Sequence, residues 1–254
     1  MRDVNWLHGL NPVKEALRGK RKVLEVYLQR GKSEGSKREV LSLCASLGIK
    51  TSYVDRSFFS SFPKGHQGIA ARTGSLRSYS LHDLREITAG RGAPPLYLLL
   101  DGIVDPRNLG AIIRTAEAAG IHAVITEKRR TATGETVAKT SAGALEYLPL
   151  IRVPNIKHAI KLMKEEGVTV FGAEADGERD YWSFDFRGPV ALILGSEGKG
   201  LRETVRKSCD YTLRIPLVGR VGSLNVAVAA GVLVYEVLRQ RRGKEAESSP
   251  SNQG

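Results

Sequence analysis

Five short segments rich in apolar residues recur between residues 96 and 215 of this 254-residue chain, and stretches with helical spacing separate them. Continuous apolar runs of roughly four to eight residues are typical of strands that are covered on both faces. Strands that alternate with helices in this way indicate an α/β fold with a parallel sheet. The sequence therefore predicts such a sheet, with strands at residues 96–100, 122–126, 168–172, 190–194 and 211–215.

The first of these predicted strands leads into a helix that holds two unexplained polar residues. Asp105 followed by Pro106 is typical of a helix start, and Gly120 is a suitable end. Asn108 lies in the first turn, and Arg114 follows less than two turns later in a small, apolar run. The helical pattern requires neither side chain. Arg114 is thus either a surface residue whose stem covers apolar atoms or a cation placed for a ligand.

A glycine-rich loop follows the predicted strand at residues 190–194. Glycines at 195, 198 and 200 allow backbone amides to approach a ligand closely. The loop does not match the known phosphate-binding patterns, because Leu201 and Arg202 stand where a lysine and a hydroxyl residue would be needed. Glu197 places a carboxylate inside the loop. We therefore expect a ligand with positive charge or hydrogen-bond donors, and not a phosphate.

The polar triplet Ser223, Leu224 and Asn225 precedes a helix that is otherwise nearly all apolar. Ser223 follows the turn residues Gly219 and Gly222, so we expect it to be the N-cap of a helix over residues 223–240. One interpretation is an ordinary capped core helix. The other is a small-ligand site between the helix N-terminus and the preceding loop.

The positive charge of the chain is unevenly distributed. Residues 1–75 contain 14 Lys and Arg against 6 Asp and Glu, whereas residues 93–240 contain 19 against 17. A basic part beside a nearly neutral one favours binding of a phosphate backbone by the first and chemistry in the second. A solvated basic surface is the alternative. We therefore predict a small basic α/β RNA-binding domain at 1–75, a linker at 76–94, a catalytic domain at 95–240 and a disordered tail at 241–254.

Within residues 1–75 the pattern alternates between helix and strand. We expect helices that begin at Asn11 and at Lys37, strands at 23–28 and 50–54, and an edge strand at 69–72. Phe58, Phe59 and Phe62 are expected to pack the small core, with base stacking as the less favoured role.

The composition also excludes several classes of protein. No apolar run approaches the roughly 18 residues of a membrane span, and no signal-peptide pattern opens the chain, so we expect a soluble cytoplasmic protein. Cys44 and Cys209 lie far apart and match neither a metal site nor a disulfide framework. We expect no structural metal.

Three segments together resemble the motifs of the SpoU (TrmH-type) family of RNA ribose methyltransferases, in the order found in that family. The motifs are N-L-G-A-I-x-R-T-A from Asn108, G-x-E-G-x-G from Gly195, and I-P-x-x-G-x-x-x-S-L-N-V-x-V-A from Ile215. The likeness spans residues 95–240, and the preceding region, with His8-Gly9 and His66-Gln67-Gly68-Ile69, is similar to the substrate-binding domain of the RlmB branch. Leu217 and Ala227 depart from the more usual Met and Ser.

This resemblance implies a SPOUT-type sheet with a C-terminal trefoil knot, a homodimer, and transfer of the methyl group of S-adenosylmethionine to a ribose 2′-hydroxyl. It implies a reactive pocket formed by Asn108, Arg114, Glu197, Ser223 and Asn225. It also implies cofactor contacts from Gly195, Gly198, Ile215, Leu217 and Leu224. Whether Arg114 is the base is left open, because a guanidinium is almost always charged in a protein. Arg114 could instead bind a phosphate while Ser223 or water relays the proton.

The substrate implied by the RlmB-like first domain is a guanosine in 23S ribosomal RNA. A tRNA ribose methyltransferase is one alternative. A non-catalytic RNA-binding factor for ribosome assembly is another, which the intact set of polar motif residues disfavours. Apolar residues over 223–240 make that helix a candidate dimer interface, although it could equally be buried within its own subunit.

Overall fold

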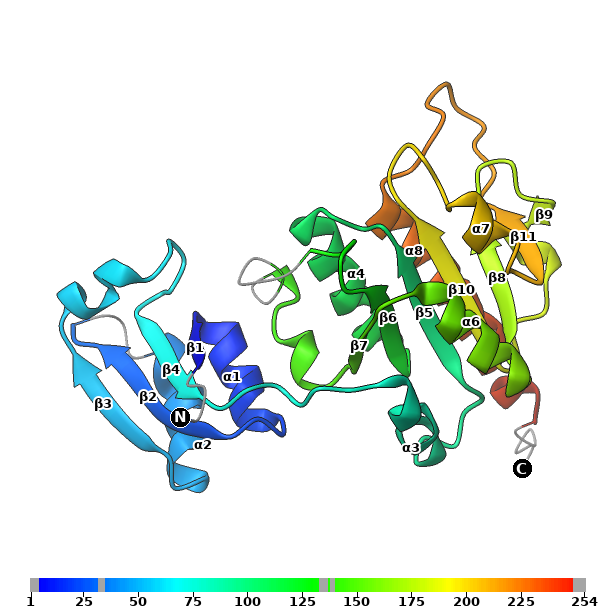
Figure 1. The fold of residues 1–254 in the computed structure, drawn as a ribbon. Coiled ribbons are helices and arrows are strands. Elements are labelled where there is room, and N and C mark those ends of the chain that lie inside the picture. Colours follow the sequence, from blue (N-terminus) through cyan, green and yellow to red (C-terminus); the bar gives the residue numbers. More distant parts are fainter. Residues whose placement is uncertain (1–4, 32–34, 133–136, 138–139, 249–254) are drawn as a thin grey trace, which may run out of the picture. The chain divides into compact units, whose positions relative to one another are not determined.

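The computed structural model describes residues 5–31, 35–132, 137 and 140–248. The chain forms two compact units (Figure 1). The smaller unit comprises Met1–Arg77 and Ser141–Tyr147, and the larger comprises Ser78–Thr140 and Leu148–Gly254.

The larger unit is built on a seven-stranded sheet in which every neighbouring pair is parallel. The strand order is β7-β6-β5-β10-β8-β11-β9. The α/β fold with a parallel sheet predicted from the apolar runs is thus confirmed. Two strands escaped prediction, because β7 is short and alternates in burial and β9 has only two residues. The strands are β5 (Leu96–Asp101), β6 (Ala123–Glu127), β7 (Leu150–Val153), β8 (Thr169–Ala173), β9 (Arg179–Asp180), β10 (Val190–Gly195) and β11 (Tyr211–Arg214).

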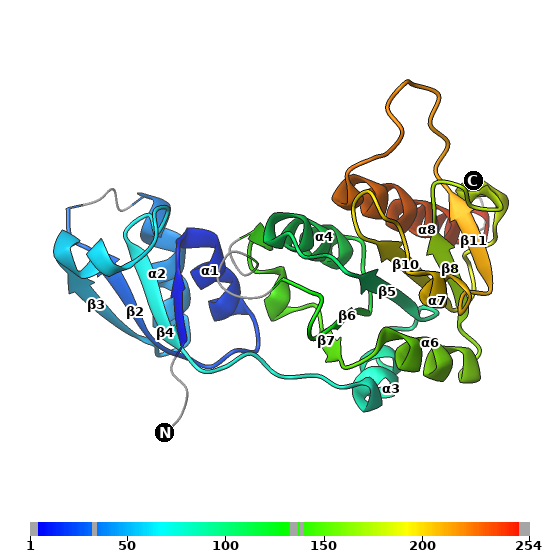
Figure 2. The ribbon, with the colours of Figure 1, turned by 45° about the horizontal axis from the view of Figure 1, so that its top comes forward.

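Helices cover both faces of this sheet (Figure 2). On one face α4 (Pro106–Ala118) packs against α8 (Val226–Ser248). On the other, α6 (Ile156–Glu165), α3 (Leu84–Ala89) and α7 (Glu203–Arg206) share a core with the buried strand residues. Short 3₁₀ turns complete the unit at Leu81–Asp83 and Tyr181–Ser183. No helix in the described ranges has the length and apolar character needed to cross a membrane.

The helix starts on the α4–α8 face follow capping chemistry, but one of the two predicted caps is wrong. Asp105 caps α4 as expected, because its carboxylate accepts a hydrogen bond from the Arg107 amide at 2.8 Å. The cap of α8 is Asn225 and not Ser223. Its side-chain oxygen accepts from the Ala227 amide at 2.9 Å, so the helix begins at Val226. Ser223 lies before it, in the extended loop.

The apolar residues of α8 are not all buried. Val226, Ala230, Leu233, Val234 and Val237 are buried, whereas Val228 is 53 % exposed. The apolar residues thus divide between the face against the sheet and the outer surface.

The helix α8 continues to Ser248, into the segment predicted as a disordered tail. The guanidinium of Arg241 donates hydrogen bonds to the carbonyls of Pro94, Pro95, Phe186 and Gly188. These contacts hold the end of the helix on the unit despite its polar composition. Residues 249–254 lie outside the described residues.

The smaller unit is a four-stranded sheet, in the order β1-β4-β2-β3, with both of its α-helices on one face. The strand β4 is interior and not at the edge, as the sequence had indicated, because the unpredicted β1 pairs with it. The elements are β1 (Asn5–His8), α1 (Leu10–Arg18), β2 (Val23–Gln29), a 3₁₀ turn (Gly35–Lys37), α2 (Arg38–Ser46), β3 (Lys50–Val54), the 3₁₀ turn η2 (Arg56–Ser61) and β4 (Ile69–Thr73).

Two further features of the smaller unit depart from the sequence pattern. Of the three phenylalanines expected in its core, Phe59 is buried, but Phe58 and Phe62 are only partly so. The segment Ser141–Tyr147, which contains the 3₁₀ turn Ala144–Glu146, also packs in this unit. There Glu146 forms a buried ion pair with Arg21 at 3.0 Å.

Candidate active site

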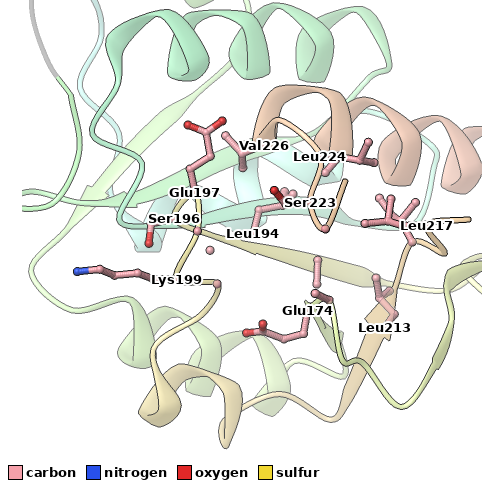
Figure 3. Close-up of a pocket in the computed structure, with 18 residues that line it drawn as sticks. Glu174, Leu194, Ser196, Glu197, Lys199, Leu213, Leu217, Ser223, Leu224 and Val226 are labelled. Carbon is pink, nitrogen blue, oxygen red and sulfur yellow. The ribbon is translucent and has the colours of Figure 1, made fainter. Parts of the chain in front are cut away.

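A cavity of about 370 Å³ lies beyond the carboxyl ends of β8, β10 and β11 (Figure 3). This volume falls in the range of small-molecule sites, roughly 300–1,000 Å³. Parallel sheets commonly bind ligands at this edge. The wall is formed by three segments that are distant in sequence, namely Ala173–Ala175, Leu194–Gly200, and the stretch from Leu213 to Ala229.

The glycine-rich loop forms one wall as a tight turn. The amide of Gly200 donates to the Ser196 carbonyl at 3.0 Å, and the Ser196 amide donates back to the Gly200 carbonyl at 3.1 Å. A side chain at Gly195 would collide with the backbone of Gly200, and Gly200 itself has a φ of 65°. Both positions therefore require glycine if the turn is to keep this shape.

Glu174 supports this turn from beneath. Its carboxylate accepts a hydrogen bond from the Leu201 amide at 2.8 Å. Burial raises the pKa of Glu174, which favours a protonated form relative to an exposed glutamate. The sequence analysis did not single out Glu174, although a carboxylate directly after the predicted strand at 168–172 was a usable signal.

Glu197 is fixed by two amide side chains from the helices on one face of the sheet. The Asn225 amide nitrogen donates to one Glu197 carboxylate oxygen at 3.0 Å, and the Asn108 nitrogen donates to the other at 3.4 Å. Asn225 also donates to the Asn108 side-chain oxygen at 3.0 Å. Three residues predicted for one pocket thus form one network, and it joins the start of α4, the start of α8 and the glycine-rich loop. In Figure 3 the Glu197 carboxylate points away from Leu213 and Leu217.

A buried charge cluster, which the sequence analysis missed, anchors the end of the same loop. Arg202 donates from Nε to Asp101 at 2.7 Å and from Nη2 to Glu127 at 2.7 Å, and its backbone amide donates to Asp101 at 3.0 Å. These hydrogen bonds, led by those to Asp101, raise the pKa of Arg202. Since Asp101 ends β5 and Glu127 ends β6, the cluster ties the loop after β10 to two neighbouring strands. In the sequence, the acidic residues that end the two buried strands, Asp101 and Glu127, were the only local sign of this cluster.

The opposite side of the cavity is apolar and offers free backbone groups. Ile215, Leu217 and Leu224 line it together with Leu213. Between Leu217 and Leu224 the backbone makes no hydrogen bond with any other part of the chain that the structure describes. Its N–H and C=O groups are therefore available to a ligand. A flat ring with hydrogen-bonding edges suits such a wall, while the Glu197 end suits a polar or positively charged group.

The predicted cofactor residues all line this cavity, but only two of the five predicted reactive residues do. Gly195, Gly198, Ile215, Leu217 and Leu224 line it, as do Glu197 and Ser223. Asn108 and Asn225 reach it only through Glu197.

Arg114 is separate from this cavity. It is exposed on α4 and makes no ion pair or hydrogen bond with the described residues. Among the described residues, no group of three or more His, Cys, Asp or Glu side chains is placed to hold a metal ion.

Two family models match the chain. The SpoU rRNA Methylase family matches residues 95–235, and the RNA 2′-O ribose methyltransferase substrate binding family matches residues 6–79. Over 240 residues the chain is 38 % identical to the 23S rRNA (guanosine-2′-O-)-methyltransferase RlmB of Xylella fastidiosa, covering 93 % of this chain and 96 % of that protein. Over the same length it is 39 % identical to YacO of Bacillus subtilis, a protein assigned to the TrmH family of tRNA/rRNA methyltransferases, again covering 93 % and 96 %.

Solved structures show the same fold. The SpoU methyltransferase AviRb of Streptomyces viridochromogenes, solved in complex with the cofactor AdoMet, superposes with a TM-score of 0.78 at 27 % identity. The match covers 94 % of this chain and 91 % of AviRb. An AdoMet-bound rRNA methyltransferase of Sinorhizobium meliloti superposes with a TM-score of 0.74, also at 27 % identity, and the match covers 93 % of this chain and 87 % of that one.

Proposed function

The chain belongs to the SpoU rRNA methylase family, and on that premise we propose that it methylates the ribose 2′-hydroxyl of a guanosine in 23S ribosomal RNA. The methyl donor is S-adenosylmethionine. One observation carries the proposal: the glycine-rich loop and the segment from Ile215 to Ala229 form one cavity at the carboxyl edge of the parallel sheet, with an apolar wall at one end and Glu197 at the other. Asn108, from the remaining motif, is joined to this cavity through its hydrogen bond to Glu197.

The residues around the cavity fit this cofactor. Leu217 and Leu224 supply an apolar wall, and the unpaired backbone between them supplies hydrogen-bonding groups for an adenine. Gly195 allows close approach on the opposite side. When bound, S-adenosylmethionine supplies a methyl group activated by the positive charge of its sulfur. The protein must chiefly hold the acceptor oxygen in line and manage its proton.

The network around Glu197 positions the acceptor side of the site. Asn108 and Asn225 hold the carboxylate in one orientation, so it can accept hydrogen bonds from the nucleotide without reorganising. The Ser223 hydroxyl, also on the cavity wall, relays the proton of the ribose hydroxyl to water. Arg114, exposed on the helix that contains Asn108, binds the adjacent RNA phosphate and stabilises the developing alkoxide.

The division of labour between the two parts of the chain belongs to the same proposal. Residues 1–75 bind RNA and residues 95–240 perform the chemistry, since most of the excess positive charge lies in the first part. The match of residues 6–79 to a substrate-binding family supports this assignment. A cytoplasmic location goes with it, because ribosomal RNA is found there.

A homodimer formed through α8 is a further part of the proposal. Val228 and Tyr235 lie two turns apart on the outer side of that helix, where they are 53 % and 50 % exposed. Apolar side chains aligned on one exposed face are typical of an interface. Val228→Glu and Tyr235→Glu should each reduce the mass measured by light scattering to that of a monomer. Leu47→Glu, which changes an exposed leucine in the smaller unit, should not.

The trefoil knot implied by the family is also proposed here. Its support is the strand order, because β10 lies between the earlier β5 and β8, and β11 lies between the earlier β8 and β9. Strands inserted between earlier neighbours are compatible with a chain that threads through one of its own loops. A crystal structure in which the backbone from β10 through α8 passes through no loop would contradict the knot.

The direct test combines cofactor binding with mapping of the product. Calorimetry should detect S-adenosylmethionine binding to the purified chain, and ribose methylation should be mapped across total RNA from cells with and without it. We expect one missing guanosine mark in 23S ribosomal RNA. A missing mark in tRNA alone would overturn the ribosomal assignment, and an unchanged map with no cofactor binding would leave the non-catalytic assembly factor.

A further inference from the structure

One face of the sheet in the smaller unit carries no described α-helix and is covered only in part, by Phe58 of η2 and by Phe62. The helices α1 and α2 pack on the face formed by Val26, Leu28, Ile69 and Ala71. Strand register places Trp6, Arg72 and Glu25 side by side on the opposite face, where no described α-helix packs. The uncovered part of this face is therefore either solvated or covered by a binding partner.

Aromatic rings gather on that open face. The rings of Trp6 and Tyr27 lie 5.3 Å apart, and Tyr27 stacks on Phe58 at 5.0 Å with an interplanar angle of 20°. Phe62 approaches Trp6 edge-on at 5.4 Å. Trp6 nevertheless remains 44 % exposed, whereas Phe59 beneath the cluster is 2 % exposed. Phe59 therefore holds the cluster on the unit, and the Trp6 ring is its solvent-accessible part.

Polar groups surround the rings in a pattern that suits a nucleic acid. The Glu25 carboxylate is fully engaged by the Tyr27 hydroxyl at 2.7 Å, the Ser52 hydroxyl at 2.7 Å and Lys50 at 3.0 Å, so it does not act as a free negative charge. These contacts, led by the Tyr27 hydrogen bond, lower the pKa of Glu25 to about 2. The part of the chain that contains this face has 14 basic and 6 acidic residues.

A hollow of about 810 Å³ lies at the end of the same sheet. Its lining includes Gln29, Arg56 and His66, and His66 stacks on Phe59 at 4.8 Å with an interplanar angle of 12°. The hollow thus borders the aromatic cluster and contributes a guanidinium and hydrogen-bonding groups. Together they provide ring surfaces for bases beside groups that bind phosphate or base edges.

We propose that the open face of the smaller sheet binds unpaired bases of the RNA substrate, with one base stacked on Trp6 and its neighbour directed to the hollow at Arg56 and His66. The proposal names the part of the RNA that this unit recognises, and it rests on the proposed methyltransferase function only in taking that RNA as the substrate. Stacking on exposed aromatic rings is sequence-tolerant and requires bases that are free of a duplex.

Fluorescence of Trp6 provides the test. The chain contains two tryptophans, so full-length Trp182→Phe leaves Trp6 as the sole indole. Titration with a ten-nucleotide oligouridine should quench its emission, while a blunt RNA duplex of equal length should quench it much less. Equal quenching by duplex RNA, or quenching by neither, would overturn the proposal.

Substitutions separate stacking from general charge. Trp6→Ala should weaken oligouridine binding roughly 10-fold, as expected for the loss of one stacked base, and Trp6→Phe should restore most of the affinity. Tyr53→Ala removes a ring that is 46 % exposed on the opposite face of the same sheet, and it should have no effect. Urea midpoints of all three variants check that the unit remains folded. If Tyr53→Ala weakens binding as much as Trp6→Ala, the open face is not the binding surface.

Methylation assays distinguish failure of this inference from failure of the proposed function. With ribosomal RNA as substrate, Trp6→Ala should raise KM and leave turnover at saturating RNA unchanged. An unchanged KM in an otherwise active enzyme would overturn the inference alone. If the unaltered chain fails to methylate RNA and oligouridine still quenches Trp6, the methyltransferase function fails and binding of unpaired bases stands.

Discussion

The two sheets of this protein use the same elements in opposite ways. In the larger unit both faces are covered by helices, and the polar groups collect beyond the carboxyl ends of the strands. In the smaller unit one face carries no described α-helix, and it holds aromatic and charged side chains in the middle of the sheet. A fully covered parallel sheet leaves only its edge for a ligand, whereas a half-covered sheet offers a surface. The first arrangement suits a small cofactor and the second a flexible polymer.

The largest expected difference between the sheets is in stability, when an arginine is removed from the acidic residues that it pairs with. Arg202→Met would leave Asp101, which is 1 % exposed at its side chain, without its cation, so we expect a loss of about 3 kcal/mol in the free energy of unfolding. Arg72→Met on the open face removes a partner of Glu25 at 3.6 Å, and its cost should be less than about 1 kcal/mol. Urea denaturation measures both. Equal losses would show that the open face is as tightly integrated as the covered edge.

Turnover should respond to the larger unit alone. We expect Arg114→Lys to reduce methyl transfer roughly 100-fold, because a lysine cannot reproduce the planar, two-pronged contact of a guanidinium with a phosphate or alkoxide. Binding of S-adenosylmethionine, measured by calorimetry, should stay within a factor of two, since Arg114 does not line the cavity. A parallel loss of binding and turnover would give Arg114 a structural role instead.

Acid should affect the two sheets in opposite directions. The pKa of Glu25 is about 2, below the reference value of 4.5, so its contribution to stability is full above about pH 4.5 and is lost as the pH falls towards 2. Burial raises the pKa of Glu174, so its protonation stabilises the fold as the pH falls. Glu25→Gln should therefore reduce the loss of stability between pH 5 and pH 3, and Glu174→Gln should increase it. Urea midpoints at the two pH values test both signs.

Salt dependence is the smallest expected effect. Lys20 and Lys22 are exposed at the basic end of α1 and have no ion-pair partner among the described residues. If both contact phosphates, Lys20→Gln with Lys22→Gln should lower the slope of log affinity against log salt by about 1 to 2. Lys161→Gln with Lys207→Gln changes two exposed lysines of the larger unit, each paired with a glutamate one turn away, and should leave the slope unchanged. A slope that both pairs alter equally would mean that the charge of the smaller unit has no special role.

The covered sheet was predictable from the sequence because its longer strands are short runs rich in apolar residues, and such runs have few alternatives to burial on both faces. The short strands β1, β7 and β9 were not, because their residues pair with distant segments and show no such run. The same limit explains why β4 was expected at an edge. Only the partner strand β1, about sixty residues away, makes it interior.

In the candidate site, too, local features were predictable and long-range contacts were not. The glycine-rich loop and the triplet Ser223, Leu224 and Asn225 stand out locally, whereas the cofactor contacts of Ile215, Leu217 and Leu224 were expected only from the resemblance to the SpoU family. The capping residue was assigned to Ser223 since both Ser and Asn cap helices well, and local preference cannot choose between positions two residues apart. The contacts of Arg202 with Asp101 and Glu127 join segments about one hundred and about seventy-five residues apart, so the sequence could mark the two acidic strand ends but not the arginine that joins them.

Asn225 performs two tasks with one amide group. Its oxygen starts α8, and its nitrogen holds Glu197 and Asn108. Any rotation that releases the carboxylate must therefore also loosen the first turn of the helix. Deuterium uptake at the Ala227 and Val228 amides therefore reports how firmly the Glu197 carboxylate is held, and it can be measured without substrate.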